Sequence, residues 1–236
     1  MGRRLFANAI LGLGLVAAAA GCSASDSGYK PGELGNGGFY FSCSDAVSCS
    51  RYSNDAAKFP QAVSLGSTFQ VRFVPKSSDT LITFDEKLPD RGITIKAVGE
   101  YLSRGASGLA AIKTGYATVT SRDASGRLVD FVTLRVAKPD ALVIYAADDV
   151  TDAPKRVESV SIGKAESRTY RAFAQEKKAV LAGSLAVEWT SSAPSILEID
   201  STSEGKVTVI GRAAGTANLV AVGGTFKQEI QVEVKP

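Results

Sequence analysis

Short runs of alternating apolar and polar residues recur along the chain from about residue 59 onward. In residues 68–74, Phe69, Val71 and Phe73 alternate with Gln70 and Arg72. Similar β-rich runs occupy residues 93–95, 116–120, 131–136, 187–189, 196–199, 206–210, 217–222 and 229–234. A period of two is typical of strands with one buried face, and short strands at regular spacing favour a sandwich. The pattern therefore predicts an all-β fold.

The two halves of the chain repeat one another at an offset of about 100 residues. Gly115 begins the segment GYATV, and Gly215 begins the similar segment GTANL. Each is followed by a turn, a last alternating run and Lys-Pro, at residues 138–139 and 235–236. A period near 100 corresponds to one immunoglobulin-like domain and is too long for a solenoid repeat. We expect two such β-sandwich domains, at residues 59–139 and 140–236.

One segment, residues 164–182, fits two patterns. Tyr170 and Phe173 have the spacing of a helical stripe, whereas Tyr170, Ala172 and Ala174 would share one face of a strand. Within a sandwich domain we expect the strand.

The second half resembles a known family. Residues 187–199, VEWTSSAPSILEI, are similar to the Trp-Ser-Ser strand pair of the bacterial Ig-like domain, group 2 (BIG2), and residues 205–217 are similar to its glycine-rich continuation. Leu197 departs from the family, which usually has Ala there. The resemblance implies an immunoglobulin-like sandwich with Trp189, the single tryptophan, as a core anchor. Residues 59–139 keep only the later part of the pattern, so we expect a degenerate domain of the same kind.

The N-terminus has the pattern of an export signal. Arg3 and Arg4 precede an apolar stretch, residues 5–20, which is too short and wrongly flanked for a membrane span. The following AAGC resembles the lipobox of bacterial lipoproteins, with Ala19 where Leu is usual, and implies a signal peptide at 1–21 and a lipidated Cys22. The alternatives are a plain secretory signal that leaves Cys22 as a free thiol, and export by the twin-arginine route. Ser23 favours the outer membrane, by resemblance to the lipoprotein sorting rule.

We expect residues 22–58 to lie outside the sandwiches. Residues 23–38 are rich in Ser, Gly, Asp and Asn, a composition typical of a flexible linker. Cys43 and Cys49 follow, and two nearby cysteines in an exported chain favour a structural disulfide. The alternative, a redox or metal pair, lacks the C-x-x-C spacing and further thiol or imidazole ligands.

Composition argues against several classes of function. The 236 residues contain no histidine, which excludes imidazole bases and Ser-His-Asp or Cys-His catalysis. Loss of Arg3 and Arg4 with the signal lowers the formal charge from +3 to +1, too little for a nucleic-acid-binding surface. We therefore expect no enzyme activity, no cofactor and no nucleic-acid partner. One weak metal hypothesis is calcium bound by Asp148, Asp149 and Asp152 in the interdomain segment.

The function that these patterns favour is that of a lipid-anchored cell-envelope protein with a structural or adhesive role. Its expected partners are the membrane, through the anchor, and a surface protein or polysaccharide. The alternative is a glycan- or peptidoglycan-binding module, and a hydrolase is a third. A row of exposed aromatic side chains would favour glycan binding, whereas two close carboxylates in a cleft would favour a hydrolase.

Overall fold

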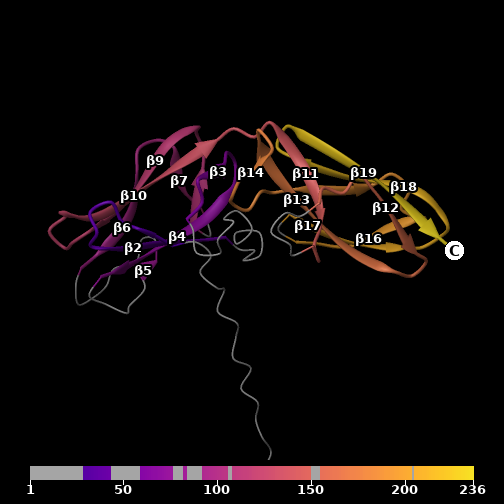
Figure 1. Ribbon diagram of the computed structural model, residues 1–236, viewed down its shortest axis with the longest axis horizontal. Helices are drawn as coiled ribbons and strands as arrows, with labels where there is room; N and C mark the ends of the chain where they lie inside the picture. The colour runs from indigo at the N-terminus through magenta and orange to yellow at the C-terminus, as the bar shows by residue number, and fades with distance from the viewer. Residues whose placement is uncertain are drawn as a thin grey trace, which may run out of the picture.

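A computed structural model describes residues 29–43, 59–76, 82–83, 92–105, 108–149, 155–203 and 205–236. These residues form strands and turns and include no helix, hence none that could cross a membrane. They fold into two β-sandwiches that lie end to end along the long axis of the molecule (Figure 1).

The first sandwich packs a sheet of strand order β1-β2-β4-β8-β7, with β5 beside β4, against a sheet of order β3-β10-β9-β6. Its strands are β1 Tyr29–Pro31, β2 Gly37–Ser42, β3 Ala62–Ser64, β4 Thr68–Pro75, β5 Ile82–Thr83, β6 Thr94–Val98, β7 Leu102–Gly105, β8 Gly108–Ala111, β9 Gly115–Arg122 and β10 Leu128–Ala137. Neighbouring strands are antiparallel, except that β3 runs parallel to β10.

The second sandwich packs a sheet of order β11-β13-β17-β16, with β14 beside β13, against a sheet of order β12-β19-β18-β15. Its strands are β11 Ala141–Ala146, β12 Ser159–Gly163, β13 Ser167–Glu176, β14 Ala179–Val180, β15 Glu188–Ser191, β16 Leu197–Ser203, β17 Lys206–Gly211, β18 Gly215–Gly223 and β19 Phe226–Lys235. Strand β12 runs parallel to β19. The ambiguous segment is a strand, β13, as expected.

The strand order is that of an immunoglobulin domain. In the second sandwich, β11-β13-β17-β16 corresponds to the order A-B-E-D and β19-β18-β15 to G-F-C. The first sandwich has the same arrangement, with β2-β4-β8-β7 and β10-β9-β6 in the equivalent places. It therefore contains the whole set of strands, although its β6 lacks the tryptophan that β15 carries at Trp189. The echo between Gly115 and Gly215 aligns β9 with β18, the F strand of each domain.

Each sandwich has its own hydrophobic core, built from the alternating positions that the sequence pattern indicated. In β4, Phe69, Val71 and Phe73 are all buried between the sheets. Trp189 is buried in the second core, with 7% of its surface exposed. The prediction of an all-β fold is confirmed, and Trp189 packs among the apolar side chains of the second core.

The prediction that residues 22–58 lie outside the sandwiches is wrong for residues 29–43. Strand β2 pairs with β4 over its whole length, and its Phe39 and Phe41 are fully buried in the first core. The glycines that suggested a flexible linker instead allow close packing. A Cβ on Gly37 would lie 2.3 Å from the Phe73 ring, and one on Gly32 would lie 2.1 Å from the Asp130 side chain.

A buried carboxylate fixes the turn between β1 and β2. Asp130 has no exposed surface, and its two oxygens accept hydrogen bonds from the backbone N–H groups of Leu34 (2.9 Å) and Asn36 (2.8 Å). Phe131 N–H donates to it as well, at 2.8 Å. Because a buried carboxylate must be hydrogen-bonded to be tolerated, this network ties the N-terminal strands to β10.

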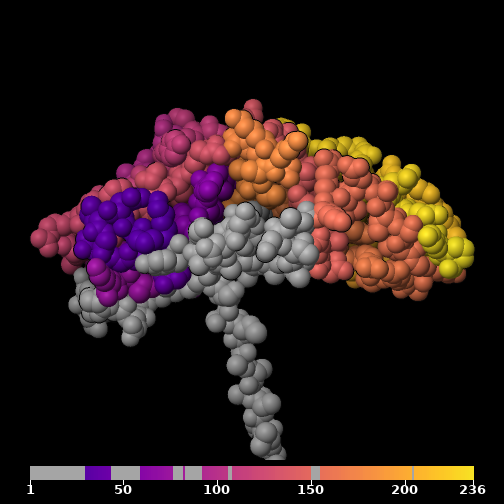
Figure 2. All heavy atoms as spheres, in the orientation of Figure 1, coloured from indigo at the N-terminus to yellow at the C-terminus, as the bar shows by residue number. Residues whose placement is uncertain are grey.

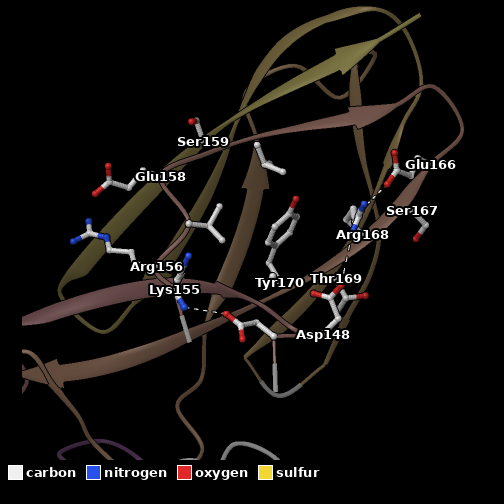
Figure 3. A pocket seen from close by; sticks show the side chains of 14 residues that line it. Asp148, Lys155, Arg156, Glu158, Ser159, Glu166, Ser167, Arg168, Thr169 and Tyr170 are labelled. Carbon is white, nitrogen blue, oxygen red and sulfur yellow. Dashed lines mark hydrogen bonds and ion pairs between the residues drawn. The ribbon is translucent and has the colours of Figure 1, made fainter. Parts of the chain in front are cut away.

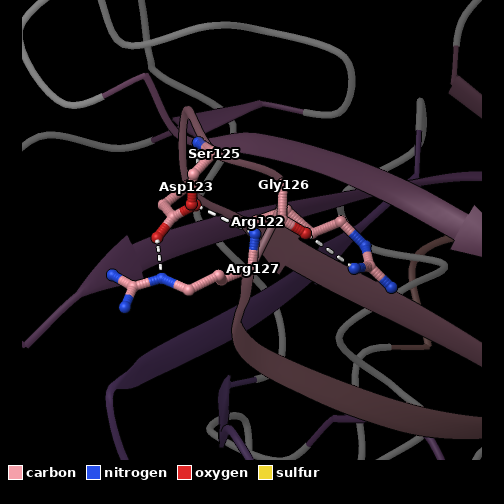
Figure 4. A network of polar contacts seen from close by, with 5 residues as sticks. All are labelled: Arg122, Asp123, Ser125, Gly126 and Arg127. Carbon is pink, nitrogen blue, oxygen red and sulfur yellow. Dashed lines mark hydrogen bonds and ion pairs between the residues drawn. The ribbon is translucent and has the colours of Figure 1, made fainter.

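The turn at residues 123–126 joins β9 to β10 and is held by a network of polar contacts (Figure 4). Asp123 accepts hydrogen bonds from Ser125 N and Oγ (2.9 and 2.6 Å) and from Arg127 N and Nε (both 2.9 Å). These bonds, first from Ser125 and then from Arg127, lower the pKa of Asp123 from 3.8 to about 2. Arg122 donates to the Gly126 carbonyl at 2.9 Å, which closes the turn from the other side.

The two sandwiches are joined by backbone hydrogen bonds across the domain boundary. The chain after β14 lies against the outer edge of β3 (Figure 1). Thr68 and Ser184 exchange both backbone hydrogen bonds, at 2.9 and 2.8 Å. Ser64 N–H donates to the Ala182 carbonyl at 2.9 Å, and Ala182 N–H donates to the Ala62 carbonyl at 3.1 Å. A segment of the second sandwich therefore covers the edge strand of the first, which would otherwise expose unpaired backbone groups.

Side chains reinforce this joint. Ala182 is fully buried and belongs to the core of the first sandwich, although it comes from the second. Gly183 adopts a φ of +100°, and a Cβ there would lie 2.2 Å from Ser67 Oγ. An ion pair between Arg135 and Glu176 also crosses the boundary. In the space-filling view the two sandwiches meet without a gap at the orange segment that follows β14 (Figure 2).

Candidate functional site

A pocket of about 510 Å³ opens on the side of the second sandwich, between the edge strand β12 and strand β13 (Figure 3). It lies where the chain passes from one sheet to the other, after β11. Figure 3 shows Tyr170 in the middle, with Lys155, Arg156 and Glu158 on one side and Asp148 and Arg168 on the other. The lining residues are Ala146, Asp148, Asp149, Lys155, Arg156, Val157, Glu158, Ser159, Val160, Glu166, Ser167, Arg168, Thr169 and Tyr170.

The backbone of the two sandwiches is closely equivalent beside this pocket. In the first, Gly66 N–H donates to the Ala111 carbonyl at 2.8 Å. In the second, Ala165 N–H donates to the Gly211 carbonyl at 2.7 Å. Both residues at the turn have positive φ, +83° for Gly66 and +63° for Ala165. The two turns are therefore equivalent in hydrogen bonding and backbone conformation, at an offset of 99 residues.

This equivalence explains why the pocket exists. Three residues beyond each turn, Phe69 in the first sandwich corresponds to Arg168 in the second. By strand register, Phe41 lies opposite Val71, and Ala146 lies opposite Tyr170 in the equivalent place. In the first sandwich the phenylalanines fill this region, since the Phe41 and Phe69 rings stack at 5.1 Å and Phe59 packs on Phe41 at 5.8 Å. The second sandwich has a small and a charged residue at two of these positions, and the space remains open.

Arg168 lies between two carboxylates at the mouth of the pocket. Its Nε donates to Glu166 at 2.6 Å, and its Nη1 lies 3.7 Å from Asp148. Glu166 also accepts a hydrogen bond from Gly163 N–H at 2.6 Å. The Gly163 bond and then Arg168 lower the pKa of Glu166, while Glu166 raises the pKa of Arg168. Both groups therefore stay charged near neutral pH, and Glu166 is poorly suited to act as a general acid.

Glu166 also distinguishes the edge of the second sandwich from that of the first. The N–H of Ser64 in β3 bonds across the domain joint to Ala182, whereas the equivalent N–H of Gly163 bonds to the Glu166 carboxylate of its own domain. The edge strand β3 of the first sandwich thus joins the two domains, whereas the equivalent strand β12 of the second is capped by the Glu166 side chain.

Tyr170 is the buried polar group of the pocket. Its side chain is 2% exposed, and its hydroxyl has no hydrogen-bond partner among the described residues. Burial raises the pKa of Tyr170 to about 12, and the charges of Arg168 and Glu166 act on the same hydroxyl. The hydroxyl therefore remains protonated and able to donate a hydrogen bond at neutral pH.

The carboxylates of the calcium hypothesis have protein partners. Asp148 lies near Arg168, and Asp149 accepts a hydrogen bond from Lys155 N–H at 2.9 Å. Asp152 lies outside the described residues. Within the described ranges no three His, Cys, Asp or Glu side chains are grouped as metal ligands. The calcium site stays a prediction that the described residues do not support.

Two predictions concern cysteines. Cys22 and Cys49 lie outside the described residues, so the lipidated cysteine and the pairing of Cys43 with Cys49 stay predictions. Cys43 itself is disulfide-bonded and buried at the end of β2. Its position next to the first core shows that this segment is part of the sandwich.

The described tyrosines do not form an exposed row. Tyr116 is 70% exposed on β9, whereas Tyr145 and Tyr170 are buried and Tyr101 packs against the first core. Tyr145 lies on the opposite face of its sheet from Tyr170, where it accepts a hydrogen bond from Gln175 at 3.0 Å. The feature that would have favoured glycan binding by a flat aromatic face is therefore absent from the described part of the chain.

The comparisons with known proteins identify no family for this chain, so the fold assignment rests on the strand order. No protein-family model matches the chain, and no curated protein sequence matches it. Similar solved structures include domains 4 and 5 of the S-layer protein SbsC, with 18% identity, a TM-score of 0.33, and coverage of 70% of this chain and 90% of that one. The Yersinia pseudotuberculosis adhesin InvE has 12% identity, a TM-score of 0.33 and coverage of 75% and 57%. The D00-D0 domain of intimin has 17% identity, a TM-score of 0.26 and coverage of 73% and 92%.

Proposed function

We propose that this chain is a lipid-anchored protein of the bacterial cell envelope whose two immunoglobulin-like sandwiches form one rigid, non-catalytic stalk. The observation that carries the proposal is the domain joint. Four backbone hydrogen bonds and a shared core at Ala182 hold the two sandwiches together. Two domains joined only by a linker would move independently, whereas a hydrogen-bonded and apolar joint fixes their relative orientation.

The anchor at Cys22 supplies the other half of the proposal. The signal-like N-terminus precedes Cys22, and the first described strand begins at Tyr29, only seven residues later. Seven extended residues reach at most about 25 Å, so the first sandwich would lie close to the membrane surface. The second sandwich would then project along the long axis of the stalk, where it can present a surface to a protein or polysaccharide.

Metabolic labelling with a clickable fatty acid tests the anchor. We expect the wild-type protein to be labelled and recovered with membranes, and the Cys22→Ala variant to be unlabelled and released. A Cys43→Ala/Cys49→Ala double variant keeps Cys22 and serves as the matched control, which should retain the label. Equal labelling of the Cys22→Ala variant would contradict the proposed anchor. Protease treatment of intact cells then distinguishes a surface-exposed stalk from a periplasmic one.

The pocket beside Tyr170 favours a second candidate function, the binding of a glycan of the envelope.

A further inference from the structure

The pocket of the second sandwich is a built feature and not a packing accident. The equivalent region of the first sandwich is filled by Phe41, Phe59 and Phe69, so the fold is able to close it with apolar side chains. In the second sandwich, Ala146 and Arg168 stand at the places of Phe41 and Phe69. An open pocket lacks the packing that the phenylalanines provide, and a bound ligand would replace those contacts.

A buried hydroxyl points to a ligand. The Tyr170 side chain is 98% buried and lines the pocket, yet its hydroxyl has no partner among the described residues. Val71, the equivalent residue in the first sandwich, carries no polar atom. Burial of a hydroxyl without a hydrogen bond is unfavourable, so a ligand group that pairs with it would gain affinity.

The walls define the chemical class of that ligand. Four carboxylates and three cationic side chains line the pocket, and the Arg168 guanidinium already lies between Glu166 and Asp148. The charges therefore largely compensate one another and do not favour an anionic ligand. Closely spaced donors and acceptors suit vicinal hydroxyl groups, which both donate and accept hydrogen bonds. Val157 and Val160 add an apolar wall, as is usual in pockets of small molecules.

We propose that this pocket binds a neutral saccharide unit. The volume of about 510 Å³ lies within the range of small-ligand sites. The Tyr170 hydroxyl and the polar groups of Arg168 and Asp148 bond to sugar hydroxyls, and the valines contact the C–H face of the ring. Arg168 is half exposed and its contact with Asp148 is long at 3.7 Å, so its side chain can rearrange around the ligand. The inference deepens the second candidate function and does not depend on the anchor.

Nuclear magnetic resonance titration of the full chain tests the assignment, in a detergent without a sugar headgroup. The probes are glucose, galactose, N-acetylglucosamine and their neutral disaccharides, with glucuronic acid and a zwitterionic dipeptide as charged comparisons. We expect at least one neutral sugar to shift the amide resonances of residues 155–160 and 166–170, with a millimolar Kd. No such binding by any neutral sugar, or tighter binding of a charged probe, would overturn the assignment.

Two variants separate pocket binding from nonspecific effects. Tyr170→Phe removes the hydroxyl and keeps the ring, and should weaken binding about five- to tenfold. Ala146→Phe restores the phenylalanine of the first sandwich and should abolish binding. The matched control is Tyr145→Phe, which removes a hydroxyl on the opposite face of the same sheet and should leave the Kd unchanged. Equal affinities of the wild type and Tyr170→Phe would show that the hydroxyl is not part of a sugar site. Loss of sugar binding leaves the anchor experiment unaffected, so the two proposals fail separately.

Discussion

Replacing Tyr170 by Phe should stabilise the protein, although it removes a polar group from a buried side chain. The hydroxyl is buried without a hydrogen-bond partner among the described residues, whereas in the unfolded chain water solvates it. A buried, unpaired hydroxyl costs roughly 1–3 kcal/mol, so its removal should raise the free energy of unfolding by about 1 kcal/mol. The ring, which provides the apolar contacts of Tyr170, is unchanged in the Tyr170→Phe variant.

The same substitution at Tyr145 should have the opposite effect on the free energy of unfolding. Tyr145 is buried in the same sheet, but its hydroxyl accepts a hydrogen bond from Gln175 Nε2 at 3.0 Å. Tyr145→Phe removes that bond and leaves the Gln175 amide unpaired, which should lower stability by about 1 kcal/mol. Between the two variants we therefore expect a difference of about 2 kcal/mol, or roughly 4–8 °C in Tm for a protein of this size.

Urea denaturation and calorimetry of the two variants in the absence of sugar measure this difference directly. Wild type and variants should have equal m-values, since neither substitution changes the surface exposed on unfolding. If Tyr170→Phe is destabilised as much as Tyr145→Phe, the Tyr170 hydroxyl has a partner in the free protein. The reasoning that makes it an open ligand group would then be refuted.

Three further outcomes follow from backbone conformation and charge. Gly183→Ala should uncouple the two sandwiches, because the added Cβ collides with Ser67 across the joint. Two calorimetric transitions should then replace one. The control is Gly224→Ala, which also has a positive φ but nothing within 4 Å, and which should cost only about 1 kcal/mol of stability. Ala165→Gly should stabilise the second sandwich by roughly 0.5–1 kcal/mol in urea denaturation, since it relieves a φ of +63°, whereas Gly66→Ala should destabilise the first. Because the pKa of Asp123 is lowered to about 2 in the folded state, the stability that its carboxylate provides is present above pH 3.8 and lost as the pH falls toward 2. In acid denaturation, Asp123→Asn should flatten that part of the plot of stability against pH. An unchanged plot would contradict the role of Asp123 in the turn.

Much of the fold could be predicted because alternation records which face of a strand is buried. The pattern of residues 68–74 becomes β4, and the single Trp189 lies in the second core because burial of a large apolar ring is strongly favourable. The turn at Asp123 was predictable because its residues hydrogen-bond locally. Local chemistry of this kind needs no knowledge of the rest of the chain.

Features that depend on contacts between distant parts of the chain could not be predicted from local patterns. The Ser, Gly, Asp and Asn content of residues 23–38 favours a flexible linker, whereas in the fold Gly37 allows close packing against Phe73. The joint is made by backbone groups of residues near Ala182. The small side chains of these residues give no hydrophobic pattern from which the joint could be predicted. The sequence indicates the pocket only when Phe69 and Arg168 are recognised as equivalent positions, which requires the turns before them to be aligned. An alignment of the two halves of the sequence at an offset of 99 residues could have indicated it.

Amide hydrogen exchange at the domain joint tests the central claim, that the two sandwiches form one rigid unit. The amides to follow are those of Ser64, Thr68, Ala182 and Ser184, which donate the four hydrogen bonds across the boundary. If the joint is rigid, these amides exchange as slowly as those of the central strands, because they open only with the sandwich itself. If they exchange at the rate of exposed loops while both cores stay protected, the sandwiches move independently and the stalk proposal is contradicted.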